Sequence, residues 1–410
     1  YLFSYNILKS IIKIVYLGLL IHLLTLIVNY ENDGINLSTI LWLKGLNNMQ
    51  HVFDGHNDLL LRLWIEQDYE AKLFLEGGQS VINTKMNTAM GIGNEGHIDL
   101  TRAQKGGLSG GFFAMFVPDP NMGNSKRSDG FIDSKEIEQS YALRVTTEMI
   151  DIINKIILGS DEKVELILNK SDLDQDNYTK NIHEKLKMLI HIEGAECIDK
   201  DLNQLDLLYG KGLRSIGPVW SRSNIFAHGV PFNFPGSPDI GPGLKGPGKE
   251  LVKACNSKGI ILDLSHLNEA GFWDVAKITS KPLVATHSNS HSITPSPRNL
   301  TDKQLDAIAE TEGVVGLNFA TGFLRSDGKK NANTPLSQMI SHLDKLIERL
   351  GENGVALGSD FDGAQIPESI GDCTGLPNLV NAMKTAGYGS DLINKICFKN
   401  WINLIHKTIK

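Results

Sequence analysis

Eight short runs of apolar and β-branched residues follow Met49, and their spacing constrains the fold more than any other feature of the 410-residue chain. Several runs are continuously apolar rather than alternating, which is typical of strands buried on both faces of a parallel sheet. The pattern therefore predicts an α/β fold. The runs are His51–Asp54, Gly111–Val117, Met188–Glu193, Leu213–Val219, Gly259–Ser265, Pro282–Thr286, Gly313–Asn318 and Gly354–Ser359.

Segments with helical periodicity separate these runs. Ser140–Leu158 and Pro335–Leu350 carry apolar residues at helical spacing, and Thr301 is a suitable N-cap for a helix over Asp302–Thr311. Alternating strands and helices indicate βα units and a parallel sheet. Eight such units in roughly 360 residues match a (β/α)8 TIM barrel.

A doubly wound open sheet is the structural alternative. It needs a glycine-rich phosphate turn after the first strand, where this chain has His56-Asn57-Asp58. The Gly/Pro-rich stretch Pro231–Gly248 lies between the fourth and fifth predicted strands, so we interpret it as a long loop rather than a linker. Residues 49–410 are therefore predicted to form a single barrel domain.

The first 48 residues differ in character from the rest of the chain. Ile14–Tyr30 is mostly apolar and carries no formal charge, and it reaches the lower limit of length for a membrane-spanning helix. No methionine precedes Met49, which favours the interpretation that residues 1–48 are translated upstream sequence and that the protein is cytoplasmic. An uncleaved membrane anchor is the alternative. A signal peptide is disfavoured because no small-residue cleavage site follows the apolar stretch.

Charge and cysteine content argue against two further classes. The formal net charge is −7, from 40 Lys and Arg against 47 Asp and Glu, and gives no support for nucleic-acid binding. The cysteines are far apart and form no Cys-x-x-Cys pair, so we expect neither a thiolate zinc site nor a disulfide scaffold. They are Cys197, Cys255, Cys373 and Cys397.

Imidazole and carboxylate side chains stand at the carboxyl ends of five predicted strands. Because the carboxyl ends of barrel strands meet at one mouth, we expect these side chains to converge. They are His56 and Asp58 after the first strand, Glu193 at the end of the third, His266 after the fifth, His287 after the sixth and Asp360 after the eighth.

This set of residues has the chemistry of a metal centre. Nitrogen and carboxylate ligands without thiolates suit Zn²⁺, with Mn²⁺, Co²⁺ or Fe²⁺ as alternatives. Residues i and i+2 of an extended chain point to the same side, so His56 and Asp58 can hold one ion together. Three imidazoles and two carboxylates are too many for one open catalytic zinc, whereas two metals that share a carboxylate use them all. Such metals lie roughly 3.5–4 Å apart and hold a bridging hydroxide.

A single histidine at a strand end is more often a hydrogen-bonded core residue than a ligand, so the metal prediction rests on the whole set. His191 lies two residues before Glu193 and is expected on the same face, one layer deeper in the barrel. The remaining histidines considered, which stand in helical or loop contexts, are predicted to be at the surface: His97, His183, His342 and His406.

Six ordered motifs, from Phe53 to about Trp401, resemble those of the membrane dipeptidase (renal dipeptidase) family of zinc peptidases, within the amidohydrolase-like barrels. The run Gly217–Arg222 is similar to one in the bacterial branch of that family. The motifs are Phe53-Asp54-Gly55-His56-Asn57-Asp58, Ile192-Glu193-Gly194, Leu262-Asp263-Leu264-Ser265-His266, Ala285-Thr286-His287-Ser288, Ser296-Pro297-Arg298-Asn299 and Gly358-Ser359-Asp360-Phe361-Asp362-Gly363.

The resemblance implies a role for each metal-site residue. His56 and Asp58 would bind one Zn²⁺, His266 and His287 would bind a second, and Glu193 would bridge both. Asp360 would be the acid/base carboxylate beside the bridging hydroxide.

The resemblance also implies how substrate is bound. Arg298 would hold the terminal carboxylate of the substrate, for which a planar guanidinium is well suited. Where the animal enzymes carry a substrate-contacting histidine after the fourth strand, this chain has Trp220. The Trp220 indole could line the pocket or donate one hydrogen bond, and Arg222 or His228 in the same loop could reach the substrate.

Together these expectations describe a zinc-dependent dipeptidase that accepts dipeptides with a C-terminal D-residue. Another binuclear metal amidohydrolase, acting on N-acyl-amino acids, lactams or lactones, is the first alternative. A non-catalytic barrel is the second, and the presence of all six site residues argues against it. A symmetric homodimer is the general expectation for a barrel enzyme, and a membrane association depends on residues 14–30.

Overall fold

The computed structural model describes residues 49–78, 96–120, 135–174 and 185–410. The chain divides into two compact units, Tyr1–Met49 and Gln50–Lys410, and every element below belongs to the second. The apolar stretch 14–30 and the proposed start of the protein concern residues outside this description. Among the described residues, none of the helices is both long enough and apolar enough to cross a bilayer.

Eight parallel strands form the predicted (β/α)8 barrel. One group pairs in the order β1 (Val52–Asn57), β2 (Leu108–Phe116), β4 (Leu186–Glu193), β5 (Leu213–Gly217) and β6 (Ile261–Leu262). The other pairs in the order β7 (Val284–Ala285), β8 (Val314–Asn318) and β9 (Val355–Gly358).

The two groups meet at two places, which we call the seams of the barrel, and so form a ring. Each seam has a single parallel bridge: Asp263↔Val284 between β6 and β7, and Asn57↔Phe361 between β1 and β9. All eight predicted strands are therefore present, and the predicted runs around β6 and β7 are reduced to two residues each. A ninth strand, β3 (Val164–Leu166), pairs with the start of β4 and was not predicted.

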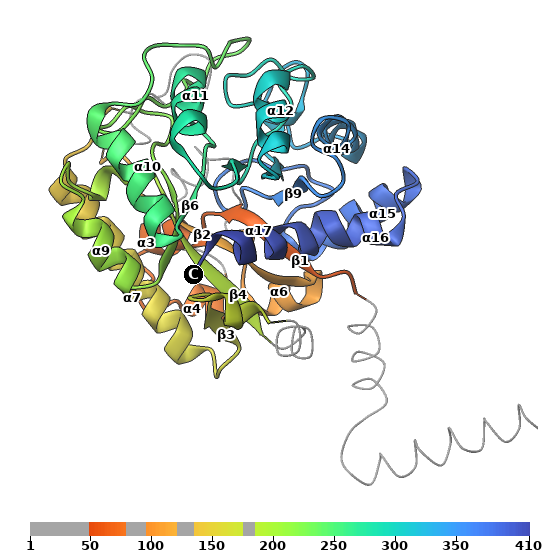
Figure 1. Cartoon of the computed structure of the whole chain (residues 1–410). Helices are drawn as coiled ribbons and strands as arrows, with labels where there is room; N and C mark the ends of the chain where they lie inside the picture. Colours follow the sequence, from red (N-terminus) through yellow and green to blue (C-terminus); the bar gives the residue numbers. More distant parts are fainter. Residues whose placement is uncertain (1–48, 79–95, 121–134, 175–184) are drawn as a thin grey trace, which may run out of the picture. The chain divides into compact units, whose positions relative to one another are not determined.

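Helices surround the strands, as Figure 1 shows. The three predicted helices are present as α7, α12 and α14, and Thr301 caps α12 in a capping box with Gln304. The α-helices are α3 (Leu59–Ile65), α4 (Lys72–Leu75), α6 (Leu100–Gly106), α7 (Gln139–Gly159), α9 (Asn203–Gly210), α10 (Gly246–Lys258), α11 (Glu269–Ile278), α12 (Asp302–Glu310), α13 (Thr321–Leu324), α14 (Leu336–Leu350), α15 (Leu376–Thr385), α16 (Ser390–Asn394) and α17 (Asn400–Thr408). Short 3₁₀ turns η1 (Lys170–Leu173), η2 (Ala195–Cys197) and η3 (Cys373–Gly375) and the π-turn η4 (Lys395–Lys399) complete the set.

The interior of the barrel is closed by apolar residues and by the C-terminal helix α17. Phe53, Phe112 and Leu189 from three strands form one buried cluster with Trp401 of α17. The Trp401 indole donates a hydrogen bond of 2.8 Å to the Leu357 carbonyl of β9. A second, larger apolar cluster includes residues of the strands and of the outer helices. The polar strand ends therefore stand above a dry apolar floor.

Gly55 in β1 is one of the positions where this packing leaves no room for a side chain. A Cβ at this position would lie 2.4 Å from the Thr286 carbonyl oxygen, 2.6 Å from the Trp401 ring and 2.9 Å from the Leu357 carbonyl oxygen. Two of these three neighbours are backbone atoms of other strands, so the methyl group could be accommodated only if the strands moved apart.

We therefore expect Gly55→Ala to lower the free energy of unfolding by about 1–3 kcal/mol or more, the usual effect of overpacking a core. Gly210→Ala in α9 is the matched control, because a Cβ there meets nothing within 4 Å. Thermal unfolding of both variants tests this. Equal midpoints for the two would contradict the packing account.

Candidate metal centre

The six predicted strand-end residues come together at the carboxyl end of the barrel. They are all buried, with at most 9% of any residue exposed. His56 is the penultimate residue of β1, Asp58 directly follows that strand and Glu193 ends β4. His266, His287 and Asp360 lie just beyond β6, β7 and β9, respectively. Side chains from five strands thus meet at one point, as the barrel arrangement predicted.

Glu193 Oε1 is at the centre of this group. It lies 2.9 Å from His266 Nε2, 3.3 Å from His287 Nε2 and 3.6 Å from His56 Nε2. His56 Nε2 is also 3.5 Å from Asp58 Oδ2, and the Nε2 atoms of His266 and His287 are 3.1 Å apart. One carboxylate oxygen therefore faces three imidazole nitrogens.

Burial shifts the pKa values of four of these residues toward their uncharged forms. It raises the pKa of Glu193 well above its usual range and also raises that of Asp58. It lowers the pKa values of His266 and His287 well below the usual range, and the positive charge of nearby Arg298 lowers both further. These two imidazoles are therefore neutral and can offer a nitrogen lone pair.

His56 behaves in the opposite way. Desolvation lowers its pKa, but the negative charges of Glu193 and Asp58 outweigh this effect and raise it to about 10. Both ring nitrogens of His56 are buried and, among the described residues, neither has a hydrogen-bond partner. Buried carboxylates, neutral imidazoles and unpartnered nitrogens together fit divalent metal ions with nitrogen and oxygen ligands.

Hydroxyl groups orient two of the imidazoles. His266 Nδ1 lies 2.7 Å from Ser221 Oγ, and His287 Nδ1 lies 2.9 Å from Thr286 Oγ1. With Nδ1 donating its proton to the hydroxyl oxygen, each ring presents an unprotonated Nε2 to Glu193. A fixed tautomer of this kind is the usual support for a histidine that binds metal.

The backbone turns sharply at His266 and Asp360, whose φ angles of 67° and 58° are in the left-handed region. Non-glycine residues rarely adopt this conformation, and it is concentrated at functional sites. Asn318, at the end of β8, donates a 2.9 Å hydrogen bond from its side-chain amide to Asp360 Oδ2. Asn318 was not predicted as a site residue, because nothing in its local sequence distinguishes it from an ordinary strand-end asparagine.

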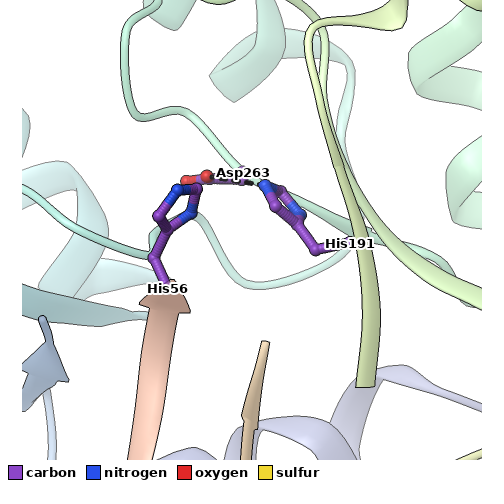
Figure 2. Close-up of side chains that lie close together, drawn as sticks. All are labelled: His56, His191 and Asp263. Carbon is purple, nitrogen blue, oxygen red and sulfur yellow. Dashed lines mark ion pairs between the residues drawn. The ribbon is translucent and has the colours of Figure 1, made fainter. Parts of the chain in front are cut away.

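His191 lies one layer below the centre, as expected. Its Nδ1 is 2.9 Å from Ser215 Oγ, and its Nε2 is 3.6 Å from Asp263 Oδ2. Figure 2 shows His191, Asp263 and His56 facing one another. One ring nitrogen or carboxylate oxygen of each residue lies within 4.8 Å of those of the other two. The Asp263 carboxylate already accepts three short hydrogen bonds from Ser265 and Thr286, so we assign it to support of the strand ends rather than to a further metal site.

Two histidines that were predicted at the surface are buried. His97 Nδ1 accepts a hydrogen bond from the Asp362 backbone, and the His97 backbone N–H donates to the Asp362 carboxylate, at 2.8 and 2.6 Å. His342 on α14 accepts a hydrogen bond from the Ser290 backbone, and burial lowers its pKa to about 4. Their hydrogen-bond partners are distant in the sequence, so the local sequence could not predict that these two histidines are buried. His406 is half-buried, and His183 lies outside the described residues.

A cavity of about 790 Å³, its open mouth included, lies directly over the centre. Aromatic rings form one wall, and the Trp220 ring packs against Phe116 and Phe232 at centroid distances of 4.8 and 5.2 Å. Phe232 and Phe323 were not predicted as lining residues. The lining residues are Asp58, Leu61, Phe116, Glu193, Trp220, Phe232, His266, Ala320, Thr321, Gly322, Phe323, Lys330, Asp360, Gly363, Ala364 and Gln365.

The two predicted substrate-binding arginines differ in their surroundings. Arg298 is buried, donates to the His287 carbonyl at 3.1 Å and lies 5.3 Å from the centroid of the Phe323 ring. Its Nε has no hydrogen-bond partner among the described residues. The Arg222 guanidinium instead forms a buried ion pair of 2.6 Å with Glu196. Neither Arg222 nor Arg298 is among the residues that line the cavity. His228, which also does not line it, lies 2.9 Å from Ser223 Oγ.

Comparisons with known proteins agree with this picture. The model of the membrane dipeptidase family (peptidase family M19) matches residues 43–409. A metallopeptidase from Rhodobacter sphaeroides, solved with a phosphinate mimic of the dipeptide L-Ala-D-Ala, is 43% identical to this chain with a TM-score of 0.80, and the match covers 88% of this chain and 100% of that one.

Two further relatives have similar identity. The metallopeptidase called dipeptidase AC, of family M19, is 44% identical with a TM-score of 0.78 and covers 88% of this chain and 99% of its own. An uncharacterized protein in the pqqA 5′ region of Klebsiella pneumoniae is 44% identical over 258 residues, which are 63% of this chain and 94% of its own length.

The environment of Arg222 predicts that it acts on stability. Removal of its charge would leave Glu196 buried without a partner, which typically costs about 3–5 kcal/mol. We expect Arg222→Met to lower the unfolding midpoint in urea strongly. Arg144→Met, which breaks the exposed pair with Glu148 on α7, is the control and should change little. Wild-type stability combined with a raised KM in Arg222→Met would instead assign Arg222 to substrate binding.

Proposed function

Because the chain belongs to the membrane dipeptidase family, peptidase family M19, and is a metal-dependent dipeptidase by that membership, we propose that it hydrolyses dipeptides, including those with a C-terminal D-residue. The observation that carries the proposal is the meeting of three imidazole nitrogens at Glu193 Oε1 on the floor of the cavity. The complex of the Rhodobacter sphaeroides relative with a mimic of L-Ala-D-Ala supports the substrate class.

The chain would hold two zinc ions through side chains already in contact. His56 and Asp58 would hold one, His266 and His287 the other, and Glu193 both. Bound there, the metals would polarise the scissile carbonyl and activate a water molecule for attack. The chain's own contribution is to hold these buried side chains in one orientation and to fix the tautomers of His266 and His287 through their Nδ1 contacts.

Asp360 would carry out the proton transfers. The Asn318 amide holds Asp360 Oδ2, which leaves Oδ1 to accept the proton of the attacking water and to deliver it to the leaving amine. A carboxylate in this position is a general base in the first step and a general acid in the second.

Arg298 and the aromatic wall would select and orient the substrate. The unpartnered Nε and the positive charge of Arg298 suit a free carboxylate. Trp220, Phe232 and Phe323 would contact the apolar parts of the dipeptide. Recognition of a terminal carboxylate would restrict the substrates to short peptides.

The first experiment measures hydrolysis of L-Ala-D-Ala by the purified chain. We expect a chelator to abolish turnover and Zn²⁺ to restore it, with two zinc equivalents per chain by mass spectrometry. Asp360→Asn should keep both metals and lose about 10²- to 10⁴-fold in kcat, the usual contribution of a general acid–base group. Glu193→Ala should lose both metals.

Several results would contradict this assignment. Near-normal kcat in Asp360→Asn would exclude its proton-transfer role, and two zinc equivalents in Glu193→Ala would exclude a bridging carboxylate. A folded, zinc-loaded protein that ignores dipeptides but hydrolyses N-acyl-amino acids or lactams would favour another metal amidohydrolase activity.

Arg298→Ala should raise KM for L-Ala-D-Ala about 10- to 100-fold with a smaller effect on kcat, because a hydrogen bond to a charged group contributes roughly 1.5–3 kcal/mol. The C-terminal amide of the same dipeptide is the matched control. The wild-type enzyme should bind it as weakly as the variant does, and the variant should not distinguish amide from acid. An unchanged KM would mean that another residue holds the carboxylate.

A further inference from the structure

Two buried carboxylates cross the two seams of the barrel. Strand pairing is reduced to a single bridge between β6 and β7 and to another between β1 and β9. Asp263 lies at the first seam and Asp54 at the second. Both carboxylates are buried, and an interior carboxylate is costly unless hydrogen bonds compensate it.

Asp263 binds Thr286 on the neighbouring strand through two atoms. Its Oδ1 accepts the Thr286 backbone N–H at 2.8 Å, and its Oδ2 accepts the Thr286 hydroxyl at 2.6 Å. Oδ1 also accepts the Ser265 backbone N–H of its own strand end at 3.0 Å. These bonds replace the strand ladder where β6 and β7 end early.

Asp54 binds Ser359 in the same way. Its Oδ1 accepts the Ser359 backbone N–H at 2.7 Å, and its Oδ2 accepts the Ser359 hydroxyl at 2.8 Å. The two seams thus show the same arrangement. In each, a carboxylate on one strand accepts hydrogen bonds from both the backbone N–H and the hydroxyl of a residue on the neighbouring strand.

In each case, the residue that donates these two hydrogen bonds directly precedes a site residue in the sequence. Thr286 precedes His287, and Ser359 precedes Asp360. Asp263 itself comes three residues before His266, and Asp54 two residues before His56. Each contact therefore connects site residues on two strands that are paired by only a single backbone bridge.

The Asp263 contact also controls the orientation of an imidazole. Because the Thr286 hydroxyl donates its proton to Asp263, its oxygen is left to accept the Nδ1–H of His287, 2.9 Å away. His287 then presents an unprotonated Nε2 to Glu193, 3.3 Å away. A hydrogen-bonded chain runs from His287 through Thr286 to Asp263.

We propose that Asp263 and Asp54 are positioning residues that act through Thr286 and Ser359: Asp263 sets the metal affinity of the His266–His287 pair, and Asp54 sets the position of Asp360. The proposal rests on the proposed function, because it assigns metal to the first pair and proton transfer to Asp360. Neither carboxylate is among the proposed metal ligands or the residues that line the cavity. The two contacts should therefore have separable effects, one on metal binding and the other on kcat.

The test of the Asp263 contact uses Thr286→Val, which removes the hydroxyl with little change in shape and keeps the backbone N–H on Asp263. We expect this variant to retain one zinc tightly and to bind the second about 10- to 100-fold more weakly in competition with a chelator, the usual effect of losing a partner behind a metal ligand. Asp263→Asn should show the same selective loss.

Two controls separate positioning from general destabilisation. Thr286→Ser retains the hydroxyl and should keep wild-type affinity for both metals. Ser109→Ala removes a buried hydroxyl that donates to the Val52 carbonyl at 3.1 Å, at the amino-terminal ends of β1 and β2, and should leave metal affinity unchanged.

The Asp54 contact is tested with Ser359→Ala. We expect both zinc ions to be retained with wild-type affinity and kcat to fall about 10-fold at nearly constant KM, because a small displacement of a catalytic group lowers the rate steeply. A lower unfolding midpoint with unchanged kcat would mean that this contact is only structural.

The possible outcomes distinguish failure of the proposed function from failure of the positioning role. A wild-type chain that binds no zinc would overturn the proposed function and this role with it. Two tight zinc ions in the wild type and equally in Thr286→Val, or the same loss in Thr286→Ser or Ser109→Ala, would overturn the positioning role alone.

Discussion

The polar half of the barrel depends on the contact between one carboxylate oxygen, Glu193 Oε1, and three imidazole nitrogens in a largely buried space. An ionised carboxylate in such a space is strongly unfavourable without a compensating positive charge. The neutral His266 and His287 cannot provide that charge, and His56 provides it only by binding a proton, at a pKa raised to about 10. The apolar surroundings and the carboxylates together therefore create the demand for a cation.

The layers of β4 show how the barrel supports this centre. Leu189, His191 and Glu193 alternate along the strand, so they share its inward face at successive heights. Leu189 belongs to the apolar floor with Trp401 of α17, whereas Glu193 lines the cavity. His191 lies between them and hydrogen-bonds within the barrel. The inward-facing side chains of β4 thus become more polar along the strand, from the apolar cluster at Leu189 to the cavity at Glu193.

Much of this could be predicted from the sequence because it depends on local patterns. Continuous apolar runs identified all eight barrel strands, and the residue types at their ends identified the side chains that the structure brings together at Glu193. The residue-by-residue roles remain predictions. The edge strand β3 has only three residues, too few for a clear pattern.

Features set by distant contacts could not be predicted. The burial of His97 depends on Asp362, 265 residues away, and the left-handed backbone at His266 and Asp360 leaves no mark in the residue type. The orientation of Arg222 depends on Glu196, a residue with no distinguishing motif around it. Asp54 and Asp263 lie within the motifs that resemble those of the family, but only the geometry shows that each reaches across a seam.

The surroundings of Trp220 show what the loop after β5 contributes. Arg222 lies behind the wall, held by Glu196 and by the Val117 carbonyl, with its guanidinium carbon 5.3 and 5.7 Å from the centroids of the Phe116 and Trp220 rings. A cation at this distance stabilises both rings and sets their orientation from the side opposite the cavity. Trp220 thus belongs to an aromatic surface that it forms with Phe116 and Phe232. On this side the cavity offers shape and apolar contact, whereas its charged lining residues are Asp58, Glu193, Lys330 and Asp360.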